Sequence, residues 1–202
     1  MSAAGEPPFV VLSRETVWSG FCRLERVVFD RRTASGALHR HVFEIETHGR
    51  AAAVLPYDPL RRQAVLVRQL RLPQALDGDD PMSLEIVAGL LDVAGEGPEA
   101  TARREAHEEA GLELGALDCI AATRPSPGLC AEKVWIYLAE VDLGRARIAD
   151  GGGRADEGEE LEVVVLPLAD LGRLVDGGSL DLKTLFAAQT LRLRRPELFD
   201  EV

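Results

Sequence analysis

The sequence Gly89-Leu-Leu-Asp-Val-Ala-Gly-Glu96 is followed, after seven residues, by Arg104-Glu-Ala-His-Glu-Glu-Ala-Gly-Leu112. Pro98 stands where a first helical residue tolerates a missing N–H, and Gly111 stands where a left-handed C-cap is favoured. One face of the helix between them carries small residues that let it lie close to a sheet: Ala102, Ala106 and Ala110. We therefore expect a loop that leads into a helix, which begins at Pro98 and ends before Gly111.

Three carboxylates lie on another face of this helix, because Glu105, Glu108 and Glu109 are three and four residues apart. Like charges at this spacing cost an isolated helix roughly 0.2–0.5 kcal/mol per pair, a cost that a bound cation reverses. A set of oxygen ligands suits a hard ion such as Mg²⁺ or Mn²⁺ rather than zinc. The alternative is a solvated acidic face whose charges pair with Arg103 and Arg104.

The stretch from Gly89 to Leu112 resembles the Nudix box. In that motif glycine, five residues, glutamate and seven residues precede Arg-Glu-apolar-x-Glu-Glu-x-Gly-apolar, and this chain fits it throughout from Glu96 onward. The departure lies before Glu96, where six residues instead of five follow Gly89. We expect Gly95 to absorb the extra residue without moving the glutamates relative to one another, because glycine adopts backbone conformations closed to other residues.

Beyond the box, the chain is similar to the ADP-ribose pyrophosphatase and GDP-mannose pyrophosphatase branch of the Nudix hydrolases. The similarity extends from about Ser13 to the last helix. The stretches that carry it are Arg14-Glu-Thr-Val-Trp-Ser-Gly-Phe21, Ala52-Ala-Val-Leu-Pro-Tyr-Asp-Pro59, Val67-Arg-Gln-Leu-Arg71, Leu84-Glu-Ile-Val-Ala-Gly89, Ser126-Pro-Gly128 with Glu132, and Asp156-Glu-Gly-Glu-Glu160. The resemblance implies an α+β protein with the Nudix fold, an α/β/α sandwich around a mixed sheet, and a small N-terminal antiparallel β domain.

The hydrophobic pattern of the chain agrees with this class, because strand-like runs alternate with a few helical segments. We expect strands within residues 10–46 and at 51–57, 63–71, 83–87, 117–123, 133–140 and 161–166, helices at 168–176 and 181–194, and acidic loops at 76–81 and 150–160. The expected domains are an N-terminal β meander at residues 1–48 and a Nudix catalytic domain at residues 49–202. Such a meander has little core of its own, so we expect it to pack against a second subunit.

The resemblance also implies the roles of particular residues. The implied metal ligands are the carboxylates of Glu105, Glu109 and Glu159 and the backbone carbonyl of Ala88. The implied catalytic residues are Glu157 as the base, Glu108, and Arg104, which pairs with Glu96 and holds the helix against its loop. The implied substrate contacts are Phe21, Glu44, Arg71, Leu90 and Glu132. For Glu132 a second candidate base and a surface charge are equal alternatives. Acidic loops such as 150–160 are often solvated connectors.

The activity implied is metal-dependent hydrolysis of the diphosphate bond of a nucleoside diphosphate sugar, with Mg²⁺ or Mn²⁺ as the ion. ADP-ribose, cleaved to AMP and ribose 5-phosphate, is the first candidate, and GDP-mannose or another sugar nucleotide is the alternative. Phe43 and His48 stand where the ADP-ribose enzymes have arginines, so the half of the substrate beyond the diphosphate stays open. The competing class is a Nudix-fold sensor that binds a nucleotide sugar without cutting it. The complete set of box glutamates favours the enzyme.

Composition and charge limit the partners and the compartment that this protein can have. The formal charge of −11 over 202 residues argues against nucleic acid as a partner, and no stretch has the apolar length of a membrane span. Three unpatterned cysteines favour a reducing compartment over a disulfide framework, and residues 1–8 do not resemble a signal peptide. The histidines show no metal-ligand spacing with one another. We expect a cytoplasmic homodimer in which the N-terminal domains are exchanged and both subunits build each substrate site.

Overall fold

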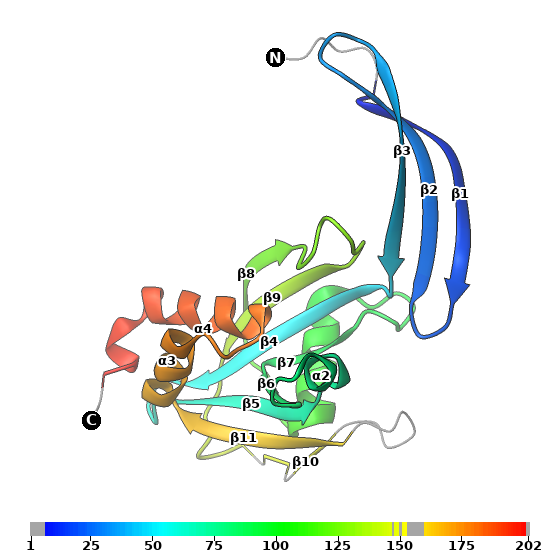
Figure 1. The fold of residues 1–202 in the computed structure, drawn as a ribbon. Helices are drawn as coiled ribbons and strands as arrows, with labels where there is room; N and C mark the ends of the chain where they lie inside the picture. Colours follow the sequence, from blue (N-terminus) through cyan, green and yellow to red (C-terminus); the bar gives the residue numbers. More distant parts are fainter. Residues whose placement is uncertain (1–6, 147, 150, 153–159, 201–202) are drawn as a thin grey trace. The chain divides into compact units, whose positions relative to one another are not determined.

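The structure, a computed structural model, describes residues 7–146, 148–149, 151–152 and 160–200 (Figure 1). The chain forms two compact units. One unit consists of Met1–Gly49 with Ser126–Glu132, and the other consists of Arg50–Pro125 with Lys133–Val202.

The N-terminal unit is a three-stranded antiparallel sheet in the order β1-β2-β3. Its strands are β1 (Phe9–Ser19), β2 (Arg23–Arg32) and β3 (Leu38–Thr47). Gly36, in the turn between β2 and β3, has a φ of 86°, a conformation that glycine adopts without strain. This sheet confirms the expected N-terminal antiparallel β structure.

Residues Ser126–Glu132 join the N-terminal unit through the end of β3. The Glu46 N–H donates to the Leu129 carbonyl at 3.0 Å, and the Ala131 N–H donates to the Glu46 carbonyl at 2.9 Å. The division expected from the sequence placed residues 126–132 in the catalytic domain. These hydrogen bonds join residues more than eighty positions apart, so no local sequence pattern could indicate them. The assignment of residues 1–48 and 49–202 to separate domains stays a prediction.

The second unit contains an eight-stranded sheet in the order β10-β11-β5-β4-β9-β8, with β6 paired to β5 and β7 paired to β4. The sheet is mixed, because β4 and β9 are parallel while the other pairs are antiparallel. The strands are β4 (Arg50–Asp58), β5 (Gln63–Leu70), β6 (Met82–Glu85), β7 (Val87–Leu90), β8 (Leu117–Thr123), β9 (Lys133–Glu140), β10 (Gly151–Gly152) and β11 (Leu161–Pro167). The helices are α1 (Leu72–Asp77), α2 (Pro98–Ala110), α3 (Leu168–Gly177) and α4 (Leu182–Arg194), followed by the 3-10 helix η2 (Pro196–Leu198).

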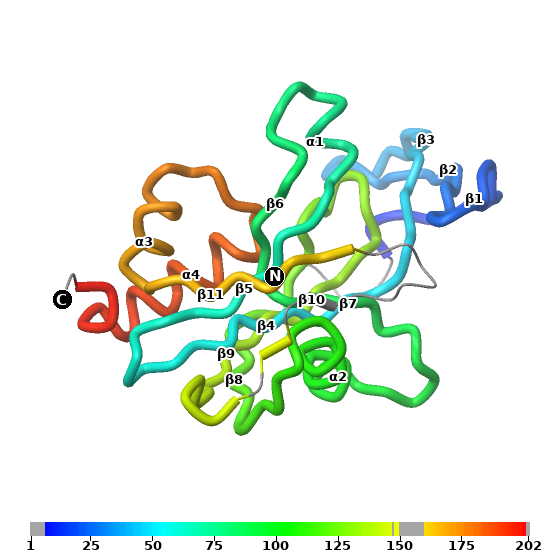
Figure 2. The backbone as a smooth tube through the Cα atoms, turned by 90° about the horizontal axis from the view of Figure 1, so that it is seen from below, coloured from blue at the N-terminus to red at the C-terminus, as the bar shows by residue number. Residues whose placement is uncertain are grey.

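Helices cover both faces of this sheet, because successive residues of β4 point to opposite sides. Ala52 and Val54 belong to the core beneath α2, and Ala53 and Leu55 belong to the core beneath α3 and α4. Figure 2 shows α2 on one side of the sheet and α3 with α4 on the other. The α/β/α sandwich expected from the sequence is thus confirmed. Among the described residues, no helix has the length and apolar character needed to cross a bilayer.

Two differences from the expectation concern the chain between β5 and β7. The chain after β5 forms the short helix α1, which Gly78 ends in a left-handed conformation with a φ of 92°. The expected strand 83–87 is interrupted at Ile86, where β6 ends and β7 begins. There the Ile86 N–H donates to the Thr184 hydroxyl of α4 at 2.8 Å, which satisfies the backbone group at the break.

Candidate active site

Helix α2 presents the box glutamates from a fixed position on the sheet. Pro98 occupies its first turn, and Gly111 ends it with a φ of 68°, as the sequence predicts. The three alanines of its inner face, Ala102, Ala106 and Ala110, are fully buried. Their small side chains let the helix axis lie close to β4, so the acidic residues on the remaining surface have a rigid support.

Arg104 ties this helix to the loop that precedes it. Its Nε donates to Glu96 Oε2 at 3.2 Å, and its Nη2 donates to the carbonyl of Leu90 at 3.2 Å. The Thr101 hydroxyl donates to the same Glu96 oxygen at 3.0 Å. Burial opposes the charge of Arg104, but the surrounding carboxylates outweigh it and raise its pKa. This geometry is what the implied structural pair of Arg104 and Glu96 requires.

The same guanidinium also contacts two of the box glutamates. Arg104 Nη1 donates to Glu105 Oε1 at 2.7 Å and to Glu108 Oε2 at 3.0 Å. The Glu105 carboxylate lies directly against Gly89, where a Cβ atom would stand 1.9 Å from Glu105 Oε1. Only glycine therefore leaves room for Glu105 in this position. The implied carbonyl ligand, that of Ala88, belongs to the peptide group that joins Ala88 to Gly89.

The donor set of this cluster fits a hard divalent cation. The Glu109 side chain is buried, and burial also raises the pKa of Glu105. The carboxylates of Glu105 and Glu108 share the Arg104 guanidinium, and the ligands implied for Glu105, Glu109 and the Ala88 carbonyl are all oxygen atoms, which a hard cation prefers. The fourth implied ligand, Glu159, and the implied base, Glu157, lie outside the described residues.

The extra residue of the box loop is absorbed in a tight turn. The Glu96 N–H donates to the Val93 carbonyl at 3.1 Å, and Gly95 has a φ of 84°. This turn leaves Glu96 within reach of Arg104. The insertion that separates the chain from the typical box spacing therefore does not disturb the helix or its glutamates.

Arg71 pairs with the buried Glu85, a partner that the sequence analysis missed. Arg71 Nε and Nη2 donate to the two carboxylate oxygens of Glu85 at 2.7 and 2.8 Å. Burial alone would raise the pKa of Glu85, but the bound Arg71 guanidinium lowers it. Arg71 was predicted to contact substrate, and here it is held by Glu85. The signal was present in the sequence, since a lone glutamate in the apolar run Leu84–Val87 needs a charged partner when buried.

The remaining predicted substrate residues fall in different places. Leu90 ends β7, and its carbonyl accepts the hydrogen bond from Arg104. Phe21 lies in the turn between β1 and β2 with its side chain 93% exposed. Glu44 lies on β3, 3.4 Å from Arg26. Glu132 belongs to the N-terminal unit, where its carboxylate lies 3.7 Å from His48 Nε2.

Comparison with known proteins identifies the family. Residues 47–188 match the NUDIX domain. The chain belongs to the Nudix family. It is 36% identical over 200 residues to the ADP-ribose pyrophosphatase of Escherichia coli strain K12, covering 98% of this chain and 94% of the relative. It is 35% identical over 173 residues to the GDP-mannose pyrophosphatase of Cronobacter sakazakii, covering 85% of this chain and 88% of that protein.

A solved structure extends the likeness to the whole fold. The crystal structure of an ADP compounds hydrolase superposes with a TM-score of 0.69, covers 96% of this chain and 98% of its own, and is 22% identical. At this identity the likeness concerns the fold alone. As a Nudix hydrolase, the protein is an enzyme that acts on pyrophosphate bonds and depends on a divalent metal ion.

Proposed function

We propose that this Nudix enzyme hydrolyses the diphosphate bond of a nucleoside diphosphate sugar, with ADP-ribose as the first substrate and AMP and ribose 5-phosphate as products. The observation that carries the proposal is the complete box, in which Arg104 holds Glu96 while Glu105 lies against Gly89. The similarity to ADP-ribose pyrophosphatases over almost the whole chain supports the choice of substrate. GDP-mannose is the second candidate, supported by the similar GDP-mannose pyrophosphatases and by Phe43 and His48 in place of arginines.

The cofactor we propose is Mg²⁺, with Mn²⁺ as the alternative, held by Glu105, Glu109, Glu159 and the Ala88 carbonyl. When bound, the metal screens the charge of the diphosphate and lowers the pKa of the attacking water. Arg104 fixes the relative positions of the loop and the helix, so the ligands are oriented before substrate arrives. Glu157 is the proposed base, which takes a proton from water once it lies within hydrogen-bond reach. Glu108 remains a proposed catalytic residue, held in place by Arg104.

A substrate panel with a matched pair of variants tests this function. In Mg²⁺, we expect ADP-ribose or GDP-mannose to release a nucleoside monophosphate and a sugar phosphate, measured by chromatography. Replacing Glu109 with glutamine (E109Q) should lower kcat by roughly two to three orders of magnitude, because it removes a ligand charge without changing shape. The control is E99Q, which changes an exposed glutamate of the same helix at a position where the box specifies no residue type.

Each adverse outcome of this experiment has a clear meaning. An unchanged rate of E109Q at saturating Mg²⁺ would make the acidic helix structural. Turnover of nucleoside triphosphates alone would contradict the proposed substrate class. Tight binding of a nucleotide sugar without turnover in Mg²⁺ or Mn²⁺ would favour the sensor.

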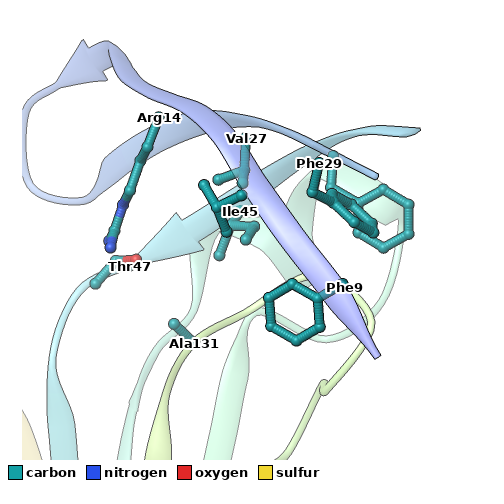
Figure 3. A pocket seen from close by; sticks show the side chains of 9 residues that line it. Phe9, Arg14, Val27, Phe29, Ile45, Thr47 and Ala131 are labelled. Carbon is teal, nitrogen blue, oxygen red and sulfur yellow. The ribbon is translucent and has the colours of Figure 1, made fainter. Parts of the chain in front are cut away.

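We further propose that the enzyme is a cytoplasmic homodimer in which the N-terminal units are exchanged. The support is the number of large apolar side chains that the N-terminal sheet exposes, since contiguous exposed apolar patches often mark interaction sites. Its exposed apolar side chains are Phe9, Val10, Val11, Leu12, Val17, Trp18, Phe21, Leu38, Val42 and Phe43. One face also carries a cavity of about 440 Å³, lined among others by Phe9, Val27 and Phe29 (Figure 3).

In this dimer, the substrate site would contain residues of both subunits. Phe21 and Glu44 of one subunit are proposed to reach the site of the other, where Arg71, Leu90 and Glu132 are the remaining proposed contacts. The exposure of the Phe21 ring supports a role in contact with another molecule.

A further inference from the structure

A second cluster of ligand-type side chains lies in the N-terminal unit, at the end of β3. His48 Nδ1 lies 2.8 Å from Glu46 Oε1, and the Cys130 thiol donates to Glu46 Oε2 at 2.9 Å. One ligand atom from each of the three residues lies within 4.8 Å of the other two.

The backbone holds these side chains together. Glu46 and Cys130 form a parallel β-bridge, flanked by the two hydrogen bonds that join Glu46 to Leu129 and Ala131. The Cys130 sulfur also accepts a hydrogen bond from the Glu132 N–H at 3.3 Å. The ligand atoms are therefore positioned by two chain segments that are already paired, which lowers the entropy cost of binding an ion between them.

The chemistry of this cluster differs from that of the Nudix box. One sulfur, one imidazole nitrogen and one carboxylate oxygen suit Zn²⁺ and similar borderline ions, whereas the box offers oxygen alone. Ligand atoms around a tetrahedral zinc ion lie roughly 3.3–3.8 Å apart, so small side-chain rotations would bring all three to coordinating distance. Three protein ligands leave a fourth position for water.

The surroundings of His48 match those of a metal-binding histidine. Its Nδ1 faces Glu46, while its Nε2 lies 3.7 Å from Glu132 Oε2. In metal sites the second ring nitrogen commonly donates to a carboxylate, which fixes the tautomer and orients the ring. When Nδ1 binds the metal, Nε2–H can donate such a hydrogen bond to Glu132 after a small approach of the two side chains. The side chains of Glu46 and His48 are 22% and 25% exposed, so an ion can enter from solvent.

We propose that Glu46, His48 and Cys130 form a second metal site, selective for Zn²⁺ and similar ions, which links Ser126–Glu132 to the end of β3. Without metal the cluster is closed by hydrogen bonds, and the sulfur carries its proton. Binding replaces the S–H bond with a metal–sulfur bond and releases that proton to solvent.

Cobalt(II) titration of the full chain in saturating Mg²⁺ tests the proposal. Mg²⁺ occupies the oxygen ligands of the box, and only a thiolate ligand gives a sulfur-to-cobalt charge-transfer band in the near ultraviolet. We expect this band to saturate at one equivalent of Co²⁺ and to disappear on addition of Zn²⁺. It should be absent in C130S and present in C119S, the matched control at an exposed cysteine of β8.

A thermal-shift measurement gives a second readout. In the presence of Mg²⁺, Zn²⁺ should raise the Tm of the wild type and of C119S. C130S and H48Q should bind Zn²⁺ at least about 100-fold more weakly, because losing a metal ligand weakens binding at least as much as losing a residue that supports a ligand. A wild-type chain without the charge-transfer band, or a C130S variant that keeps it, would overturn the proposal. An equal Zn²⁺ response in the wild type and in both folded variants would do so too. Neither readout measures turnover, so the result is independent of the proposed hydrolysis.

Discussion

The strands β4 and β1 are similar in length, but their surroundings are opposite. From Ala51 to Asp58, every residue of β4 is buried between two layers of helices. Every residue of β1 is exposed in the single chain. Apolar side chains stabilise a sheet when they are removed from water. The second unit covers its own strands with its own helices, so its stability comes from its own chain. We infer that the N-terminal sheet depends on a partner.

Removing residues 1–46 is the strongest test of this comparison. Because the second unit has its own two cores, we expect the shortened protein to unfold cooperatively, as a monomer. If the N-terminal sheet supplies both the dimer contact and part of the substrate site, turnover should be abolished. Sedimentation velocity, thermal unfolding and a turnover assay measure the three properties. A shortened protein that stays dimeric or fully active would refute the proposed exchange.

Replacing a leucine with alanine should affect stability differently in the two sheets. Leu66 of β5 is fully buried, whereas Leu12 of β1 is 47% exposed. We expect L66A to lower the free energy of unfolding by about 2–5 kcal/mol, because it leaves a cavity. We expect L12A to leave the unfolding of the second unit unchanged and to weaken dimerisation. Denaturant unfolding and concentration-dependent sedimentation separate these effects. Equal destabilisation by both variants would remove the distinction between the two sheets.

A pair of aspartates gives the smallest expected effect, with a defined pH dependence. Asp58, almost fully buried, accepts hydrogen bonds from the backbone of Arg61 and Leu143, each at 2.9 Å. Burial alone would raise the pKa of Asp58, but these hydrogen bonds and the Arg61 guanidinium lower it. We expect D58N to cost about 1.5–3 kcal/mol at neutral pH. Asp30 of the N-terminal sheet bonds to the exposed Arg40 at 3.1 Å, so D30N should cost less.

The sign of the pH effect follows from the lowered pKa of Asp58. Its contribution is present above the unfolded-state pKa of about 3.9 and is lost as the pH falls through the folded-state value. The wild type should therefore lose more stability than D58N below about pH 4. Urea unfolding at a series of pH values measures this difference. Parallel curves for the two proteins would show that Asp58 is not the source of the acid sensitivity.

The elements that sequence reasoning placed well depend on local signals. Pro98 indicates the start of α2, Gly111 its end, and the alanine spacing its buried face, and all of these signals lie within the helix or next to it. The apolar runs of β4 and β5 indicate central strands. The turn at Gly95 could also be predicted, because a glycine beside an inserted residue can adopt the positive-φ conformation of a tight turn.

The features that were missed join residues far apart in the chain. The cluster at Glu46 and Cys130 spans 84 positions, so no local spacing of histidines or cysteines could indicate it. The break at Ile86 depends on Thr184 of α4. Helix α1 was missed for a different reason: it is short and contains Pro73, and its end at Gly78 resembles an ordinary loop. Residues 157 and 159 were predicted from resemblance alone, and their roles stay predictions.

The order of strands in the second unit has a consequence for how the protein folds during synthesis. The central strand β4 needs β9 as its parallel neighbour, with Ala53 opposite Ile136, and β5 needs β11, with Val65 opposite Val165. Such distant pairings form slowly, since a long loop must close before they contribute any stability. On the ribosome, β4, β5 and α2 therefore emerge long before β9 and β11. We expect this apolar intermediate to be the stage at which a chaperone protects the chain from aggregation.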